Sequence, residues 1–395
     1  MEWKTETLGN IAFMTSGGTP SKKNPEYYKG GTIPWVRSGE LENGAIRDTE
    51  IKITQAGLDA SSAKIFPKGT LLIALYGATI GKLAYLDIDA CTNQAVCGIF
   101  ANDKVSLKFL YFFLLFHRSD LVKQGVGGAQ PNISQTILKK LIVSYPVNRA
   151  EQLRIVARIE EVFSKLDASV AELKTAKEKL KVYRQAVLKE ALTPEQGWCK
   201  CCFSDLMESV RNGYGKKPDD MGEYRILRIS SVRPGKVELS DFRCNQTPFK
   251  EDDLISENDL LFTRYNGSLE YVGVCACVPQ LQEKYAYPDK IIKCTPKLKN
   301  SYHSRFLQYS MNQGEARKYI RSKIKTTSGQ KGIAGSDIKK VVLWLPELPV
   351  QEKIVKMIDE KMSTCDNIEQ TIDISLRQAE AMRQSILKHA FKGGL

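Results

Sequence analysis

Apolar residues recur at alternating steps of four and three along residues 151–192 and again along residues 350–391. This spacing places them on one stripe of an α-helix and is the heptad pattern of a coiled coil. At 1.5 Å per residue, each helix is predicted to be about 63 Å long. The two stripes comprise Ile159, Phe163, Leu166, Val170, Leu173, Leu180 and Val187, then Ile358, Met362, Cys365, Ile372, Leu376, Ala379 and Ile386.

Two polar residues, Lys177 and Arg184, interrupt the first stripe. A charged residue at a stripe position weakens the apolar contact that holds two helices together. We therefore predict that the seam loosens at these two residues or that a partner subunit docks there.

The second stretch is a copy of the first. Identical residues recur at a constant offset of 199 positions, namely Gln152 and Gln351, Ile159 and Ile358, Asp167 and Asp366, Arg184 and Arg383. Two similar halves are related either by an approximate twofold axis or by a translation. A twofold axis lays the helices antiparallel so that they bury both stripes, whereas a translation leaves both stripes exposed. Because a lone amphipathic helix of this length is marginal, we predict the twofold arrangement.

The block before the first helix has the pattern of a mixed α/β domain. Short β-type runs are punctuated by Gly, Pro and Asn clusters. A helix is predicted over residues 106–124, with Ser106 as its N-cap, and is followed by a Gly-rich loop. The predicted strands cover residues 33–37, 70–76, 82–87, 95–100 and 141–143.

The block between the two helices repeats this order with looser identity. Its loop at residues 327–340 matches the loop at residues 127–140 of the first block. Other corresponding residues are Trp3 and Trp198, Arg37 and Arg228, Phe109 and Phe306.

The predicted fold class is α+β, with two pseudo-twofold-related α/β domains separated by a long antiparallel two-helix coiled coil. The first domain is predicted over residues 1–149 and the second over residues 198–349. The conserved helices are predicted over residues 150–192 and residues 350–395.

The 395 residues carry a formal net charge of +13. The two long stretches are nearly neutral, so the basic excess lies mainly in the two blocks, which favours a polyanionic partner. The longest apolar run, residues 109–116, is eight residues and is too short to span a membrane. The first four residues, MEWK, do not have the pattern of a signal peptide, so we expect the ten cysteines to be reduced thiols of a cytoplasmic protein.

Two motifs resemble enzyme signatures and depart from them. Residues 77–83, GATIGKL, resemble a phosphate-binding loop but have three residues between the glycines instead of four, and Leu83 follows the lysine. Residues 24–27, NPEY, resemble the amine-gripping motif of amino-methyltransferases, but Glu26 replaces a proline and no Gly-rich methyl-donor loop accompanies it. We therefore predict a turn between strands and a loop, respectively.

Candidate metal ligands are equally incomplete. Cys199 and Cys202 have the spacing of a zinc-binding pair. Cys275 and Cys277 are possible partners, but a structural site normally shows a second pair at the same kind of spacing. The three histidines, His117, His303 and His389, stand in no constellation with a nucleophile or a carboxylate. We predict no catalytic and no metal-binding residue on this chain.

Both blocks carry loops rich in groups that bind DNA. Arg side chains read guanine, Asn and Gln read adenine, and Lys, Ser and Thr hold phosphate. For any one of these residues, the alternative is a solvated loop side chain. The predicted DNA-binding residues are Thr79, Lys82, Asn93, Gln94, Gln130 and Asn132 in the first block, and Arg264, Tyr265, Asn266, Ser268, Lys325, Thr327, Gln330 and Lys331 in the second.

Two variable blocks, each followed by a near-identical long helix, resemble the specificity subunit of type I restriction-modification systems. The motifs that carry this resemblance are individually weak and jointly specific. The second block departs from the first at residues 287–290, which read YPDK in place of TNQA. The motifs lie at residues 33–35, 92–95, 128–134, 146–155 and 346–354.

The resemblance implies that each block is a target recognition domain that reads one half of a bipartite double-stranded DNA site. The helices would set the spacer between the half-sites and dock two methyltransferase subunits, with restriction subunits as further partners. S-adenosylmethionine, ATP and magnesium would belong to these partner subunits, and this chain would be non-catalytic, would hold no cofactor and would not contact a membrane.

Two other classes of function stay open on the sequence. A diverged fused methyltransferase would bind S-adenosylmethionine tightly without a partner. A coiled-coil scaffold that binds only protein would retain no DNA, although the basic charge of the blocks speaks against it.

Overall fold

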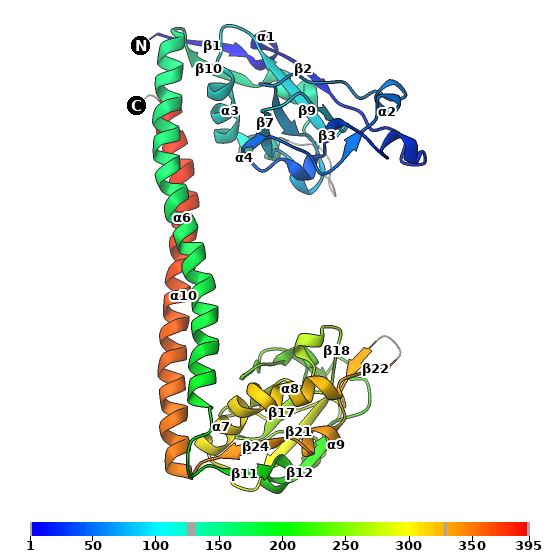
Figure 1. Ribbon diagram of the computed structural model, residues 1–395, viewed down its shortest axis with the longest axis vertical. Coiled ribbons are helices and arrows are strands. Elements are labelled where there is room, and N and C mark those ends of the chain that lie inside the picture. The colour runs from blue at the N-terminus through cyan, green and yellow to red at the C-terminus, as the bar shows by residue number, and fades with distance from the viewer. Residues whose placement is uncertain (1, 125–131, 328–329, 393–395) are drawn as a thin grey trace. The chain divides into compact units, whose positions relative to one another are not determined.

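The computed structural model describes residues 2–124, 132–327 and 330–392, and its chain forms two compact units. The first unit comprises Met1–Leu173 and Asp373–Leu395, and the second comprises Lys174–Ile372. Two long helices, α6 (Arg149–Ala191) and α10 (Leu348–Phe391), each contribute one part to either unit (Figure 1). The predicted combination of mixed α/β blocks with two long helices is confirmed.

The first unit is built on a five-stranded sheet of order β2-β9-β6-β7-β4, beside a three-stranded sheet of order β5-β3-β8 and a two-stranded sheet of β1 and β10. The pairs β2–β9, β9–β6 and β6–β7 are antiparallel, whereas β7–β4 is parallel. The strands are β1 (Trp3–Thr7), β2 (Ala12–Ser16), β3 (Ile33–Val36), β4 (Ala45–Ile46), β5 (Lys52–Ile53), β6 (Leu71–Ala74), β7 (Leu83–Leu86), β8 (Cys91–Thr92), β9 (Val96–Ala101) and β10 (Ile142–Pro146).

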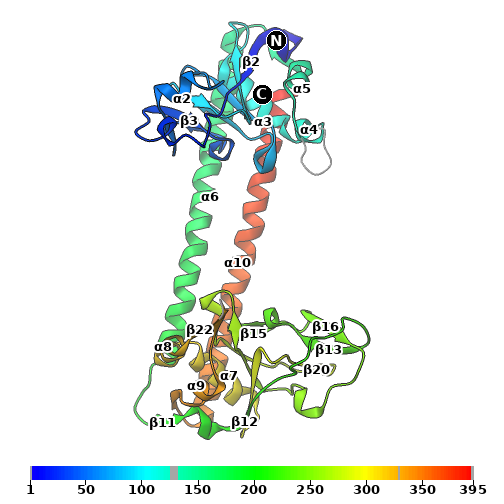
Figure 2. The ribbon, with the colours of Figure 1, turned by 90° about the vertical axis from the view of Figure 1, so that its right-hand side faces the viewer.

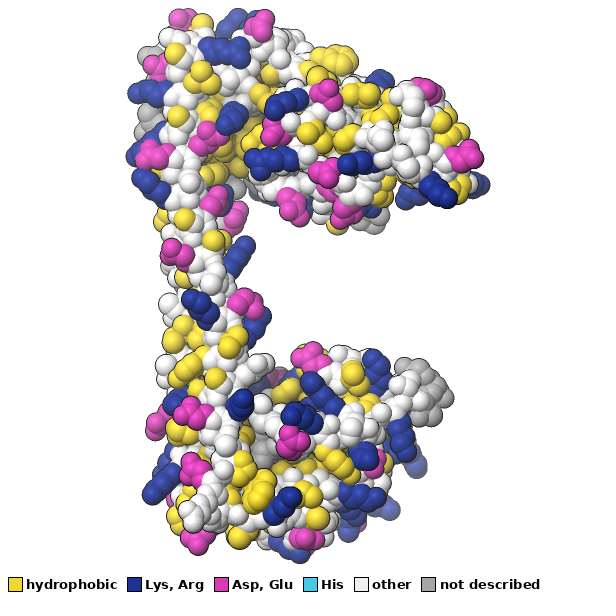
Figure 3. All heavy atoms as spheres, in the orientation of Figure 1, with side chains coloured by type: hydrophobic (Ala, Val, Ile, Leu, Met, Phe, Trp, Pro, Cys, Tyr) yellow, Lys and Arg dark blue, Asp and Glu magenta, His cyan; other side chains and the backbone are white. Residues whose placement is uncertain are grey.

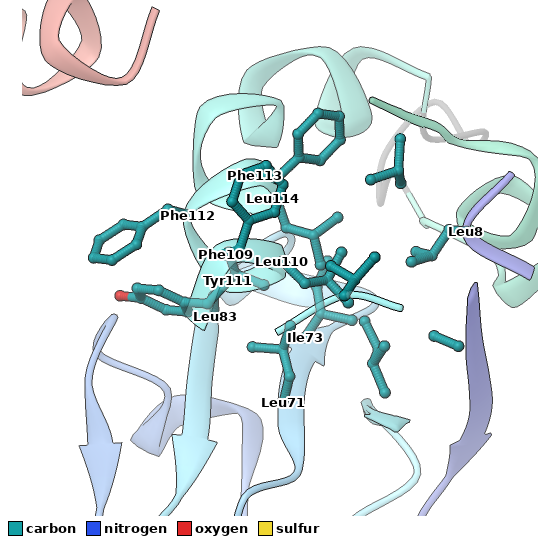
Figure 4. Close-up of a cluster of buried hydrophobic side chains, with 14 of the residues drawn as sticks. Leu8, Leu71, Ile73, Leu83, Phe109, Leu110, Tyr111, Phe112, Phe113 and Leu114 are labelled. Carbon is teal, nitrogen blue, oxygen red and sulfur yellow. The ribbon is translucent and has the colours of Figure 1, made fainter. Parts of the chain in front are cut away.

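An apolar helix, α3 (Leu107–Phe116), covers the five-stranded sheet of this unit (Figure 4). Its predicted N-cap is confirmed, because the Ser106 hydroxyl accepts a hydrogen bond from the Phe109 amide at 3.3 Å. The core that it closes includes the central strand β6, of which all four residues are buried. The remaining helices that lie wholly within this unit are α1 (Leu8–Ile11), α2 (Gln55–Asp59), α4 (Arg118–Lys123) and α5 (Gln135–Lys140).

The prediction of one helix over residues 106–124 is wrong, because the chain turns at His117, whose ψ is 5°. α3 is buried along almost its whole length against the sheet. After the turn, α4 contributes the buried Leu121 and the partly buried Val122 to the same core.

The second unit has a four-stranded sheet of order β12-β21-β17-β19, in which each neighbouring pair is antiparallel. Two three-stranded sheets, β16-β13-β20 and β18-β23-β22, and the pairs β14–β15 and β11–β24 complete it. The strands are β11 (Cys199–Cys202), β12 (Met207–Asn212), β13 (Tyr224–Leu227), β14 (Val232–Arg233), β15 (Lys236–Val237), β16 (Phe242–Asn245), β17 (Leu260–Thr263), β18 (Tyr265–Asn266), β19 (Cys275–Cys277), β20 (Tyr285–Ala286), β21 (Ile291–Pro296), β22 (Lys325–Thr327), β23 (Gln330–Gly332) and β24 (Val342–Leu345).

Three helices pack on the sheets of the second unit, namely α7 (Ser301–Met311), α8 (Gly314–Lys323) and α9 (Gly335–Lys339). The Asn300 side chain caps α7 by accepting from the His303 amide at 2.7 Å. Central strand β17 is fully buried, as is its counterpart β6.

The sequence did not predict the first strand of either unit. In the first unit, β1 pairs antiparallel with β10, the strand that precedes α6. In the second unit, β11 pairs antiparallel with β24, the strand that precedes α10. Trp3 of β1 packs on Phe109 of α3, and Trp198, which directly precedes β11, packs on Phe306 of α7, with ring centroids 6.3 and 5.8 Å apart.

The long helices run antiparallel within each unit, as predicted (Figure 2). In the second unit, Lys177 lies 3.4 Å from Glu369, and Arg184, seven residues further along α6, contacts both Glu369 (2.6 Å) and Asp366 (2.5 Å). The interpretation of Lys177 and Arg184 as points where the seam loosens is therefore wrong. These cations reach carboxylates of the facing helix and join the two helices.

The first unit contains the equivalent ion pair, between Asp167 and Arg383. The Arg383 guanidinium also lies over the Phe163 ring, 4.8 Å from its centroid. Asp167 and Arg383 correspond to Asp366 and Arg184 at the offset of the repeat, so each unit holds one copy of the same inter-helix Arg–Asp contact.

A buried glutamine anchors the start of each long helix. The Gln152 amide nitrogen donates to the carbonyls of Pro146 (2.9 Å) and Lys104 (2.8 Å), and its oxygen accepts from the Ser106 amide (2.8 Å). The equivalent Gln351 donates to the Pro346 carbonyl at 2.8 Å. These residues are 0% and 2% exposed, which explains why both copies of the repeat hold a glutamine.

Candidate nucleic-acid interface

The loop after β6 in the first unit is the turn between strands that the sequence predicts. It forms a short 3-10 turn over Gly77–Thr79 and returns to β7 through Gly81, whose amide donates to the Ala74 carbonyl at 2.8 Å. Gly77 and Gly81 have φ values of 82° and 72°, which side-chain-bearing residues rarely adopt. The half-buried side chains of Thr79 and Lys82 lie on this loop.

A second segment pairs with this loop. Tyr76 forms an isolated β-bridge with Asn132, and the Ile133 amide donates to the Leu75 carbonyl at 2.8 Å. The exposed Asn132 side chain therefore lies beside the turn that carries Thr79. Gln130 lies outside the described residues.

The turn that holds Asn93 and Gln94 lies at the same edge of the sheet. The Leu75 amide donates to the Ala95 carbonyl, and the Asn93 amide donates to the Val36 carbonyl, at 2.8 and 2.9 Å. Gln94 is exposed, and its side-chain oxygen accepts a hydrogen bond from the Thr19 hydroxyl. The predicted residues of the first block that are described thus gather at one edge, where β6 ends and β9 begins.

The second unit builds the same edge at the end of β17. The Arg264 amide donates to the Lys290 carbonyl at 2.8 Å, and the Ile333 amide donates to the Arg264 carbonyl at 3.0 Å. These two bonds match the two that Leu75 makes in the first unit. Residues 287–290 therefore occupy the place of residues 92–95 although their amino-acid sequences differ.

A small three-stranded sheet carries most of the predicted residues of the second block. Tyr265 and Asn266 on β18 pair with Gly332 and Lys331 on β23, which in turn pairs with β22. A Cβ atom added to Gly332 would lie 2.4 Å from the Tyr265 ring, so a glycine is required there. The backbones of Lys325, Thr327, Gln330 and Lys331 lie on β22 and β23.

Arg264, between β17 and β18, is held in place beside this sheet. Its guanidinium donates to the Asp289 carbonyl at 3.3 Å and lies 4.9 Å from the centroid of the Tyr265 ring. The Asn266 side chain accepts from the Ser268 amide at 3.0 Å, which folds the following turn. Aromatic stacking leaves guanidinium N–H groups free for other acceptors.

Cationic side chains gather near this sheet, and dark-blue side chains mark that edge of the second unit in Figure 3. Lys323 and Lys325 are exposed, and Lys331 is half-buried. None of the ion pairs among the described residues involves Arg264, Lys325 or Lys331. Cations without carboxylate partners are suited to a polyanion.

The first unit differs beside this edge of its sheet, where an acidic hollow follows β3. Arg37 forms ion pairs with Glu40 and Glu50, and Glu42 and Asp48 complete the carboxylates of the lining. Carboxylates repel phosphate, so the hollow itself is not a phosphate site. Sequence reasoning missed it because its four acids are spread over eleven residues without a motif.

The enzyme-like motifs have structural roles. Residues 24–27 form a loop with a 3-10 turn, in which the Asn24 side chain accepts from the Glu26 amide at 3.1 Å. Cys199 and Cys202 lie on β11, whereas Cys275 and Cys277 lie on β19 of a different sheet. Within the part of the chain that the structure describes, no group of three or more His, Cys, Asp or Glu side chains could hold a metal ion.

Burial lowers the pKa values of two of the three histidines. His117 and His303 have pKa values below the usual value for histidine, primarily because burial disfavours their charged forms. None of the helices in residues 2–124, 132–327 and 330–392 combines the length and apolar character that a membrane span requires.

Two α/β units, each with paired polar loops at one edge of its sheet and an antiparallel pair of long helix segments, define a repeated recognition protein. The model of the type I restriction modification DNA specificity domain matches residues 1–180 and again residues 195–378. The chain therefore belongs to the family of specificity subunits of type I restriction-modification systems, proteins with two target recognition domains.

Individual relatives are similar in sequence over the whole length of this chain. The EcoKI specificity subunit of Escherichia coli K12 is 30% identical over 100% of this chain and 89% of its own length. The StySPI specificity subunit of Salmonella potsdam is 26% identical over the same shares.

Solved structures share the fold. A type I restriction-modification structure described in terms of complex assembly and conformational transition matches with a TM-score of 0.77 at 18% identity, over 100% of this chain and 98% of the other. The HsdS subunit of Thermoanaerobacter tengcongensis matches with a TM-score of 0.55 at 17% identity, over 100% and 97% of the two chains.

Proposed function

We propose that this chain is the DNA-recognition subunit of a type I restriction-modification complex and that each unit reads one half of a bipartite double-stranded site. One observation carries the proposal. Both units build the same backbone edge from Leu75 or Arg264, yet the side chains presented there differ. A common scaffold with different polar side chains is what two domains that read different sequences require.

The residues on the two edges can serve both parts of DNA binding. In the second unit, Arg264 offers guanidinium donors to a base edge, while Lys325 and Lys331 can neutralise phosphate. In the first unit, Asn93, Gln94 and Asn132 offer amides that can pair with adenine, and the half-buried Lys82 on the turn after β6 offers a cation.

The long helices are proposed to set the spacer and to dock two methyltransferase subunits. Several of their apolar side chains remain exposed, including Tyr183 (48%) and Met382 (53%), which are equivalent in the repeat. Exposed apolar residues at equivalent positions of two copies favour two equivalent partners. S-adenosylmethionine, ATP and magnesium are proposed to bind the methyltransferase and restriction subunits.

The decisive experiment maps methylated bases in DNA modified by this chain with its methyltransferase partner. Replacing residues 198–349 by the matching block of another family member should change one half-site and leave the other half-site and the spacer unchanged. A change in both half-sites, or in neither, would overturn the proposal. Tight binding of S-adenosylmethionine by the chain alone would instead support a fused methyltransferase, and loss of all DNA retention would support a protein-binding scaffold.

The spacer role has its own test. Removing one heptad from each helix, residues 173–179 together with residues 372–378, should keep the antiparallel register and shorten the spacer between the half-sites. Removing the heptad from one helix only is the matched control, because it should misalign Arg184 and Asp366 and abolish assembly. An unchanged spacer after the double deletion would contradict the role.

Docking can be tested on the exposed apolar positions. The double variant Tyr183→Glu with Met382→Glu should weaken methyltransferase binding at least about tenfold, since charge in an apolar interface core is poorly tolerated. Lys174→Glu, an exposed change on the opposite face of the same helix from Tyr183, is the control and should have little effect. Calorimetry with the purified methyltransferase subunit measures both, and equal affinity for all variants would place docking elsewhere.

A further inference from the structure

Helix α8 of the second unit carries a buried arginine that the candidate interface does not use. Arg317 is only 9% exposed. Its Nη1 donates to the Val272 carbonyl at 2.9 Å, and its Nη2 donates to the Glu270 carbonyl at 2.7 Å. Both carbonyls belong to the segment that directly follows Ser268, one of the predicted DNA-binding residues.

This segment is a short 3-10 turn over Leu269–Tyr271, and a turn of one residue triplet leaves its own carbonyls unpaired. The Tyr271 carbonyl accepts a hydrogen bond from the Thr263 hydroxyl. Three consecutive carbonyls, those of residues 270–272, are therefore each held by a side chain from another element. The loop gets its shape from these contacts.

The end of the same loop is pressed against α8. Gly273 has a φ of 68°, and a Cβ atom added there would lie 2.5 Å from Cγ2 of Ile320. Arg233 adds a contact at the other side, because its guanidinium lies 4.8 Å from the centroid of the Tyr271 ring. The close approach at Gly273 lets the loop come within reach of the Arg317 guanidinium.

An arginine suits this position better than a lysine. Its planar guanidinium can reach two carbonyls at once with fixed geometry, whereas an ammonium acts as a point charge. Burial, and then the neighbouring Arg321, lower the pKa of Arg317 to about 10, so the group stays charged at neutral pH. The ion pairs of the described residues do not include Arg317, and carbonyl oxygens therefore stabilise its charge.

The first unit has an arginine at the equivalent position without this clasp. Arg118 corresponds to Arg317 at the offset of 199, and Gly81 corresponds to Gly273, since each glycine amide bonds the end of the central strand. A Cβ atom on Gly81 would lie 3.2 Å from Cγ of Arg118. Among the hydrogen bonds of the described residues, none comes from the half-buried Arg118 guanidinium.

We infer that Arg317 is a positioning residue for DNA specificity: by clasping the carbonyls of Glu270 and Val272, it fixes the turn that presents Arg264 to Ser268. The inference rests on the proposed function of the second unit as the reader of one half-site. Base discrimination in that half-site depends on a guanidinium that is itself buried away from DNA. The first half-site has no such dependence on Arg118.

The test uses the chain in complex with its methyltransferase subunits. Methylation rates are measured on the intact site and on sites with one base changed in either half. Arg317→Lys keeps the buried charge and can bond one carbonyl, and Arg317→Gln removes the charge. Arg321→Gln, one turn further along α8, and Arg118→Gln, the equivalent residue of the first unit, are the matched controls.

We expect Arg317→Lys to lower discrimination in the second half-site on the order of tenfold, the value of about one well-formed contact to a base edge. Discrimination in the first half-site should stay unchanged, and both controls should behave as the wild type. Hydrogen exchange at the amides of residues 266–273 should accelerate, while the amides of β21 keep their protection. Arg317→Gln should show a larger effect in the same half-site.

Unchanged discrimination in the second half-site of Arg317→Lys, or an equal loss in both half-sites, would overturn the positioning role. Failure of the proposed function gives a different result, because exchange of residues 198–349 would then alter neither half-site of the wild-type protein. If Arg317→Gln does not fold, Arg317→Lys alone decides the inference by the same comparison of half-sites.

Discussion

The two units form the same edge, at the ends of β6 and β17, with the same backbone hydrogen bonds and different side chains. Leu75 in the first unit is 6% exposed, whereas Arg264 at the equivalent position of the second unit holds a stacked guanidinium. The bonds to Ala95 and Lys290 are main-chain bonds and do not constrain the side chains. A main-chain scaffold can therefore stay constant while the surface chemistry changes.

The long helices show the opposite behaviour, because they repeat side-chain contacts. Asp167 with Arg383 in one unit and Asp366 with Arg184 in the other are the same pair of residue types at equivalent positions. At these positions, where the two copies agree in sequence, side chains make the contact. At the edge of each sheet, where the copies differ, main-chain hydrogen bonds hold the structure.

The largest effect on stability should come from replacing the buried phenylalanine of α3 or of α7, Phe109 or Phe306. Phe109 and Phe306 are both 0% exposed, and each packs on a tryptophan at the start of its unit, Trp3 or Trp198. Phe109→Ala and Phe306→Ala should each lower the free energy of unfolding by about 3–5 kcal/mol, because a large cavity is left in a packed core. Urea unfolding followed by hydrogen exchange mass spectrometry assigns the loss to one unit.

The exposed Phe13, of which 68% is accessible, provides the control, and Phe13→Ala should cost little. If Phe109→Ala accelerated exchange equally in both units, the units would not be independent folding bodies. The comparison between them would then lose its basis.

Replacing the buried glutamines should destabilise the two units to different extents. Gln152→Ala removes three bonds to backbone groups, two of them buried, and should cost about 2–4 kcal/mol, whereas Gln351→Ala removes one described bond and should cost about 1–2 kcal/mol. Gln185→Ala and Gln384→Ala, at exposed equivalent positions, are the controls. Equal costs for Gln152→Ala and Gln351→Ala would show that the additional bonds of Gln152 carry no net stability.

The repeat was the part of the fold that the sequence predicted best. The offset of 199 and the apolar stripes correctly predicted two α/β blocks and antiparallel long helices. The first strands were missed, because residues 3–7 and residues 199–202 have no sustained apolar alternation and each strand forms by pairing with a strand that is distant in sequence. Pairing of this kind is a tertiary effect that a local pattern does not contain.

The candidate interface was predicted in part. The structure brings Asn93, Gln94 and Asn132 to the edge that also carries Thr79, although they are spread over residues 79–132. Arg317 could not be predicted from the sequence, because an arginine on a helix is normally exposed to solvent. Its burial depends on the close approach of Gly273, which only the folded chain shows.

The inter-helix ion pairs should have a smaller effect. Arg184→Glu places an acid beside Asp366 and Glu369 and should cost about 1–2 kcal/mol, a value limited by partial exposure of the group. Adding Asp366→Arg replaces one of the facing carboxylates by a cation, so the double variant should recover part of the lost stability. Arg158→Glu, on the exposed face of the same helix, is the control, and a cost as large as that of Arg184→Glu would argue against a specific contact.

The smallest expected effect is a difference between the two units in the pH dependence of their stability. In the first unit, the Glu6 carboxylate accepts from the Tyr145 hydroxyl (2.7 Å) and contacts Lys4 and Lys104, and these partners lower its pKa from 4.5 to about 2. In the second unit, burial raises the pKa of Asp259 above its usual value. A lowered carboxyl pKa and a raised one have opposite consequences for stability.

Because its pKa is depressed in the folded state, Glu6 contributes stability above pH 4.5 that is lost as the pH falls toward about 2. Asp259 contributes stability at low pH that is lost as the pH rises through its raised pKa. Acidification should therefore accelerate hydrogen exchange in the sheet of β1 and β10 while protecting the strands around Asp259. Glu6→Gln should remove the acid sensitivity of the first unit, and Asp259→Asn that of the second. If both wild-type units lost protection in parallel between pH 5 and about 3, other carboxyl groups would control acid unfolding and the contrast between Glu6 and Asp259 would not hold.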